Sequence, residues 1–208
     1  MQSVIDLVNS IKDTSVARHS MVINKLGITE NDQPAGAFGM CHNYAILTLE
    51  LLHAYKNVWT RASVANVDIE RTRQENGERV ILITKSLFIH CMSSIEYGAK
   101  ETLTSHPSLL PLGNSRIYLR RIMELSNMHS LITAEEKALW IGAVEVRNCL
   151  THNNGIADCT MACSFPDLTV QMSDGKMVRG TLDFFPRLTQ WAIDAFGQWV
   201  LAIFEAST

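Results

Sequence analysis

Hydrophobic residues recur every three or four positions along most of the chain, which is the spacing of one face of an α-helix. The helices predicted from this pattern span 2–27, about 40–62, about 78–103, about 114–129, 133 to about 154, and about 183–205. Helices with one apolar face bury it against one another in a bundle. We therefore predict an all-α fold of about five main helices in a single domain over residues 1–208.

Glycine and proline mark the predicted breaks between these helices. The segment 28–39 contains one proline and several glycines, and 105–114 contains two prolines and a glycine, so both are predicted to be loops. Gly77 is predicted to interrupt the chain between a short charged turn over 67–76 and the third helix.

After the fifth helix the pattern changes from helical to alternating. Residues 168–172 and 176–179 alternate around Ser173-Asp174-Gly175, which is a turn signal, whereas 159–167 looks irregular. The sequence therefore predicts a small β-hairpin just before the last helix. The hairpin and that helix form a predicted extension of the bundle over about 159–208.

The helix at 133–154 has clear signals at both ends. Thr133 followed by Glu136 forms a capping box, in which each side chain accepts a hydrogen bond from the backbone of the other residue. Asn153-Asn154-Gly155 supplies residues that tolerate the left-handed conformation in which helices commonly end. We therefore expect a helix of about five turns.

The same helix is apolar on two sides. Its core stripe consists of Leu139, Ala143, Val146 and Leu150. Trp140, Ile141 and Val144 point away from that stripe and lead into a polar cluster at the end of the helix. A second apolar face needs a cover, and we predict that it meets a partner, namely a second copy of the chain packed along 133–154.

The polar cluster is Arg147-Asn148-Cys149-Leu150-Thr151-His152, in which Asn148 and His152 are neighbours one turn apart. This motif resembles that of the HEPN superfamily, whose helical bundles carry an arginine, usually a polar residue beside it, and a histidine a few residues later. The resemblance covers the helical part from about Gly39 to Asp158. It implies a homodimer in which the two Arg-His pairs converge on one site that cleaves RNA without a metal ion.

The residue types suit that chemistry. A neutral imidazole at His152 can take the proton of a ribose 2′-OH, and the resulting oxyanion can attack the adjacent phosphorus. The guanidinium of Arg147 can bind two phosphate oxygens, and Asn148 can orient the imidazole or bind the phosphate. Thr151 is a supporting candidate. The expected products are a 2′,3′-cyclic phosphate and a free 5′-hydroxyl, and DNA is not cut because it lacks the 2′-OH.

The third helix offers a supporting residue, Glu96, among apolar and small neighbours. A buried carboxylate is costly unless it is paired, so we predict that Glu96 contacts Arg147 or Arg120. HEPN-like proteins often carry a polar residue on an earlier helix that faces the motif, and Glu96 or Ser94 looks similar to it. The alternative is a glutamate on the solvent side of its helix.

Arg116, Arg120 and Arg121 gather on one side of the predicted fourth helix. They could bind the RNA backbone. The alternative, which is the more frequent outcome for such clusters, is a solvated face with salt bridges.

Composition and the absence of common motifs limit the other functions that the sequence could have. The 208 residues carry a formal net charge of −3, so any RNA contact must come from a local patch. No N-terminal signal or long uninterrupted apolar segment appears, and we expect a soluble, cytoplasmic protein with no membrane contact. No nucleotide-binding glycine loop or common hydrolase motif appears either.

The cysteines do not indicate a disulfide framework. They are Cys41, Cys91, Cys149, Cys159 and Cys163, an odd number without a CxxC pair. Cys149, His152, Cys159 and Cys163 are zinc-ligand types close in sequence, but their spacing matches no common zinc module. We expect neither a metal nor a cofactor.

Three functions fit the sequence. The first is a metal-independent endoribonuclease, such as a toxin or a defence component restrained by an inhibitory protein partner. The second is a HEPN-like module that binds nucleotides or a protein without cutting. The third is a helical interaction module in which the motif from Arg147 to His152 is accidental. Whether Arg147 acts with His152 of its own subunit or of the other stays open.

Overall fold

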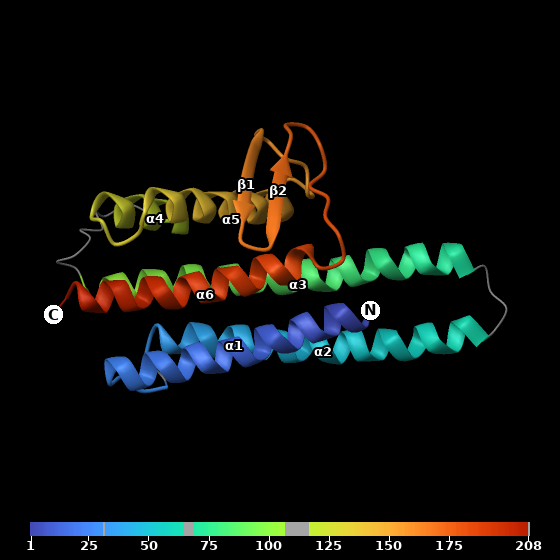
Figure 1. The fold of residues 1–208 in the computed structure, drawn as a ribbon, viewed down its shortest axis with the longest axis horizontal. Helices are drawn as coiled ribbons and strands as arrows, with labels where there is room; N and C mark the ends of the chain where they lie inside the picture. The colour runs from blue at the N-terminus through green and yellow to red at the C-terminus, as the bar shows by residue number, and fades with distance from the viewer. Residues whose placement is uncertain (31, 65–68, 107–116, 208) are drawn as a thin grey trace.

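A computed structural model describes the chain except residues 31, 65–68, 107–116 and 208, and the side chains of 59–64, 69–70 and 72–73 also lie outside the description. The described residues form six helices and one two-stranded sheet (Figure 1). In chain order these are α1 (Gln2–Leu26), α2 (Ala35–Val64), α3 (Ile69–Thr104), α4 (Leu119–Met128), α5 (Ala134–His152), β1 (Met161–Phe165), β2 (Leu168–Met172) and α6 (Phe184–Glu205). The predicted helical architecture, with a hairpin before the last helix, is confirmed.

The elements are stacked in three tiers. Figure 1 shows α1 and α2 at the bottom, α3 and α6 in the middle, and α4, α5 and the hairpin at the top. The helices α1, α2, α3 and α6 pack on one another as a bundle, and α4 and α5 pack on it mainly through α3. The indole Nε1 of Trp199 in α6 donates a 2.9 Å hydrogen bond to the hydroxyl of Ser126, which anchors α4 to the bundle.

Both α2 and α3 are longer than the positions of glycine and proline predict. α2 begins at Ala35, directly after Pro34 and ahead of the predicted start near Met40, and α3 runs through Gly77 without a break. Ala35, Ala37 and Phe38 are fully buried in the first turn of α2, and Asn76 and Val80 are buried on either side of Gly77. A glycine costs a helix only about 1 kcal/mol, so burial of its neighbours outweighs that preference.

The predicted start of α4 is wrong. Tyr118 has extended backbone angles, φ −106° and ψ 159°, and it is the N-cap of a helix that begins at Leu119. The predicted cap at Asn114 or Ser115 lies outside the described residues, as does Arg116. The predicted end is correct, since His129 is the C-cap.

The hairpin uses a different pair of strands from the predicted pair. β1 pairs with β2 antiparallel, from Met161 opposite Met172 to Phe165 opposite Leu168. The segment 176–179 forms no strand and contributes one isolated bridge, from Met177 to Ile156. Phe165 and Val170 are buried, so packing against the helices selects this pairing over the alternating pattern of 176–179.

Both predicted ends of α5 are confirmed. The Thr133 hydroxyl accepts from the backbone N–H of Glu136 at 3.1 Å, and the Glu136 carboxylate accepts from the backbone N–H of Thr133 at 2.7 Å. At the other end, Asn154 and Gly155 have φ of 53° and 85°. The N–H of Gly155 returns to the carbonyl of Cys149 at 2.8 Å. These contacts fix the helix end that carries the motif.

Replacing Thr133 with alanine is expected to lower the free energy of unfolding by about 1 kcal/mol, because the variant loses the side-chain acceptor of the capping box. Thr133→Ser keeps the hydroxyl and should stay within about 0.5 kcal/mol of the wild type. Urea denaturation of the three proteins measures the difference. Equal stability of the alanine and serine variants would show that the cap contributes nothing.

The stretch Gln74–Thr104 of α3 is long and apolar enough to cross a membrane by length and composition, with a mean hydropathy of 1.2 over its best window. However, 44% of that window is buried inside the fold, where α3 packs against α2 and α6. A core helix of a soluble protein has the same composition, and the described residues contain no second helix of this kind.

Candidate functional site

Three elements enclose a cavity at the end of the motif helix. We call it the motif cavity, and its volume is about 440 Å³. Its walls are the third helix, the start of α4, the second half of α5 and the loop that follows. The lining residues are Glu96, Tyr118, Leu119, Arg120, Val144, Glu145, Arg147, Asn148, His152, Asn153 and Asp158. All three predicted catalytic residues, Arg147, Asn148 and His152, therefore share one cavity.

The guanidinium of Arg147 is incompletely bonded. Its side chain is 24% exposed, and its Nη2 lies 3.8 Å from a carboxylate oxygen of Glu96. Its Nη1 donates to the side-chain oxygen of Asn148 at 3.4 Å, and its buried Nε has no hydrogen-bond partner among the described residues. An unsatisfied buried donor costs about 1–3 kcal/mol. An oxyanion could reach this nitrogen only if the side chain moved, because the atom is inaccessible to solvent.

Glu96 lies where the sequence predicts, beside Arg147. One carboxylate oxygen accepts from Lys100 at 2.6 Å, and the other faces Arg147. The alternative of a solvent-facing glutamate is wrong, because the side chain is only 14% exposed. Glu96 therefore links two cations from two helices, and it limits the rotation of the Arg147 guanidinium.

His152 and Thr151 differ in how free their side chains are. His152 is the last residue of α5, it is exposed, and its ring makes no hydrogen bond to a described residue. Thr151 does not line the motif cavity. Its hydroxyl donates to the carbonyl of Arg147 at 2.9 Å and lies 3.3 Å from that of Asn148, so it is used within its own helix. The imidazole is the group that is free to exchange a proton.

The predicted arginine cluster is a salt-bridged face. Arg120 donates to Glu145 at 2.7 Å and to Glu124 at 3.2 Å, and Arg121 donates to Glu124 at 3.3 Å. Arg120 lines the motif cavity, whereas Arg121 does not. Arg116 lies outside the described residues. This face corresponds to the alternative that the sequence left open, because its cations already have carboxylate partners.

The motif cavity also contains acidic groups that the sequence did not predict. Glu145 and Asp158 line it beside Glu96, which the sequence did predict, and beside Arg120 and Arg147. Counting formal charges, three carboxylates face two guanidinium groups. A single chain therefore does not attract phosphate in general, and an anion must bind at a specific point such as the partly exposed side chain of Arg147.

One group of metal-ligand types lies beside the cavity. Ligand atoms of Glu145, Asp158 and Cys159 all fall within 4.8 Å of one another. Burial, together with the nearby carboxylates, raises the pKa of the Cys159 thiol, which disfavours the thiolate that binds metals. Of the four residues weighed for zinc, only Cys159 belongs to this group. Cys149 is buried in the core, and Cys163 donates to the carbonyl of Ala138.

The apolar second face of α5 is covered by the chain itself, contrary to the expectation of a partner. Trp140 is 1% exposed, and its ring centroid lies 5.0 Å from that of Trp191 in α6. Val144 is 8% exposed and Ile141 is half-buried. β1 approaches so closely that a Cβ on Gly142 would lie 2.7 Å from the sulfur of Cys163. α6 therefore covers Trp140, and the hairpin covers α5 at Gly142.

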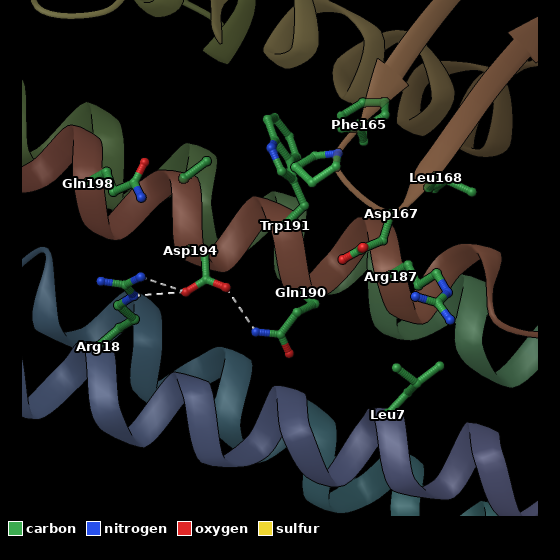
Figure 2. Close-up of a pocket in the computed structure, with 12 residues that line it drawn as sticks. Leu7, Arg18, Phe165, Asp167, Leu168, Arg187, Gln190, Trp191, Asp194 and Gln198 are labelled. Carbon is green, nitrogen blue, oxygen red and sulfur yellow. Dashed lines mark hydrogen bonds and ion pairs between the residues drawn. The ribbon is translucent and has the colours of Figure 1, made fainter.

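A second cavity of about 410 Å³ lies between α1, α6 and the turn of the hairpin (Figure 2). Arg18 pairs with Asp194 at 2.8 Å, and Gln190 donates to the other oxygen of Asp194 at 3.0 Å. Figure 2 shows these side chains bonded to one another below Trp191. Sequence reasoning missed this cavity because Arg18 and Asp194 are 176 residues apart. Arg187 pairs with Asp183, which does not line the cavity, and Asp167 has no ion pair among the described residues.

No family model, curated protein or solved structure matches this chain. The resemblance to HEPN domains therefore rests on the residues from Arg147 to His152. What the fold adds is their common cavity, the contact of Arg147 with Glu96, and the unpartnered Nε.

Proposed function

We propose that this protein is a metal-independent endoribonuclease whose active site is the motif cavity. The observation that carries the proposal is that Arg147, whose guanidinium is incompletely bonded, and His152, whose imidazole makes no hydrogen bond to a described residue, line one cavity. The partly exposed guanidinium can bind a phosphodiester oxygen. The imidazole can accept a proton. RNA supplies a partner for each group, namely a phosphodiester oxygen for Arg147 and the neighbouring 2′-hydroxyl for His152.

In the proposed reaction His152 removes the proton of a ribose 2′-OH. The 2′-oxygen then forms a bond to the adjacent phosphorus, and the bond from phosphorus to the 5′-oxygen of the next nucleotide breaks. The departing 5′-oxygen takes a proton from solvent, which leaves a 2′,3′-cyclic phosphate and a 5′-hydroxyl. Arg147 stabilises the charge that develops on the non-bridging oxygens, and Asn148 holds the guanidinium in place.

We also propose that a second copy of the chain completes the site. The exposure of Thr151 and His152 at the end of α5 supports this proposal, because it leaves that end of the helix accessible to a second copy. The contact differs from the one that the sequence suggested. Trp140 is internal, so the two copies would meet through the exposed C-terminal end of α5, where Thr151 and His152 lie.

The test is incubation of the purified protein with single-stranded RNA in excess EDTA, beside DNA of the same sequence. We expect RNA cleavage to persist in EDTA and DNA to stay intact, with 2′,3′-cyclic phosphate ends identified by mass spectrometry. The EDTA arm is decisive because Glu145, Asp158 and Cys159 lie close enough to hold a cation. Cleavage that stops in EDTA and returns with Mg²⁺ would contradict the proposal.

A second candidate function is binding of a nucleotide or a protein without cutting. The carboxylates of Glu96 and Asp158 share the cavity with Arg147 and would repel a closely held phosphate in a monomer, which favours a protein ligand within this second function. A rise in melting temperature with nucleotide, in the absence of any RNA cleavage, would support this second function.

A further inference from the structure

Tyr118 is an exposed aromatic residue at the motif cavity. It is the N-cap of α4, its side chain lines the cavity, and 57% of the residue is accessible. Isolated exposed apolar residues are common on protein surfaces and need no function. Tyr118 differs because it shares the cavity with Arg147 and His152.

A chain of contacts connects the Tyr118 ring to the motif. The ammonium of Lys100 lies 5.4 Å from the centroid of the ring, which is a cation–π contact. Lys100 also pairs with Glu96, whose second oxygen faces Arg147. α3 contributes both Lys100 and Glu96. It therefore connects the Tyr118 ring, at the start of α4, with the guanidinium of Arg147 in α5.

We propose that the Tyr118 ring stacks on a nucleobase of single-stranded RNA whose phosphate is bound at Arg147. The proposal rests on the proposed function, and it adds a substrate class. A base can reach a ring beside the cavity only when it is unpaired, so the site selects single-stranded segments. Base–aromatic stacking depends little on sequence, because every base has a π-face. Lys100 adds positive charge next to the RNA backbone.

The experiment measures binding separately from cleavage. The ligand is a fluorescent RNA oligonucleotide with 2′-O-methyl sugars, which lacks the attacking hydroxyl and is not cut. Tyr118→Ala is expected to bind it about tenfold more weakly, whereas Tyr118→Phe should bind within about twofold of the wild type. Tyr97→Ala is the matched control, because Tyr97 is 50% exposed on α3 but does not line the cavity.

Removal of the bases tests the stacking contact. A fully abasic oligonucleotide of the same length is compared with the base-containing one, since a site that reads no sequence lets the strand shift past a single abasic position. We expect the abasic oligonucleotide to bind the wild type about tenfold more weakly and to bind Tyr118→Ala no more weakly than the base-containing one does, since both changes remove the same contact. An equal loss of affinity in the wild type and in Tyr118→Ala would overturn the stacking proposal. Melting curves of all variants establish that they are folded.

The outcomes separate this proposal from the nuclease proposal. Binding that depends on Tyr118, with no cleavage of ordinary RNA, supports stacking and contradicts the nuclease. Cleavage and affinity that are both unchanged in Tyr118→Ala overturn stacking and leave the nuclease intact. If the wild-type protein does not bind the oligonucleotide at low salt, stacking is overturned as well.

Discussion

Arg147→Ala and His152→Ala are each expected to reduce the rate of RNA cleavage by about a thousandfold. The reasons differ. The first variant loses the cation that stabilises the phosphorane-like transition state, and the second loses the base that activates the 2′-hydroxyl. Arg147→Lys should also fail, because an ammonium has no counterpart of the buried Nε and cannot bind two oxygens in a plane.

Initial rates on a fluorescent single-stranded RNA in EDTA measure these losses. Arg179→Ala and His129→Ala are the matched controls, since both residues are exposed and neither lines the motif cavity. They should cleave at the wild-type rate. Full activity in both Arg147→Ala and His152→Ala would remove the nuclease proposal, and equal losses in the controls would point to a general effect on folding.

A mixture of the two inactive variants addresses the pairing of subunits. If Arg147 of one subunit acts with His152 of the other, hybrid dimers contain one intact pair, and part of the activity returns on mixing. If both residues act within one chain, no hybrid contains an intact pair and the mixture stays inactive. A strictly monomeric protein that is active by itself would contradict the proposed role of a second copy.

Local signals in the sequence predicted the motif helix well. The hydroxyl of Thr133 and the left-handed residues Asn154 and Gly155 act within a few residues of themselves, so neither end of α5 depends on the rest of the fold. The start of α2 and the continuity of α3 were mispredicted for the opposite reason. The burial of Phe38 and Val80 depends on packing between helices, which a local rule for glycine does not include.

The residues of the candidate site were also predicted only in part. The contact between Glu96 and Arg147 was predicted because a carboxylate in an apolar helix needs a partner. The acidic residues Glu145 and Asp158, and the aromatic Tyr118, were missed. Glu145 precedes Asn148 and His152 by one and two helical turns, a spacing that could have identified it. Asp158 comes from the loop after α5 and Tyr118 from the start of α4, and no sequence spacing connects these two with the motif.

Replacing Trp140 with alanine is expected to lower the free energy of unfolding by about 3–5 kcal/mol, which is a large part of the 5–15 kcal/mol typical of a folded domain. The indole is 1% exposed and packs against Trp191, so its removal leaves a cavity between α5 and α6. Urea denaturation measures the loss. Leu82→Ala is the control, because Leu82 is 59% exposed on α3 and its truncation should cost less than about 0.5 kcal/mol.

This variant also decides what the apolar second face of α5 does. If Trp140 belongs to the core, the loss of stability is the same at every protein concentration, and the association state of the folded protein does not change. If the face instead meets a second copy, the folded variant dissociates, and the wild-type midpoint rises with concentration while that of the variant does not. The burial of Trp140 against Trp191 within one chain favours the first result, because α6 already covers this face of α5 and a helix apolar on two sides then needs no partner there.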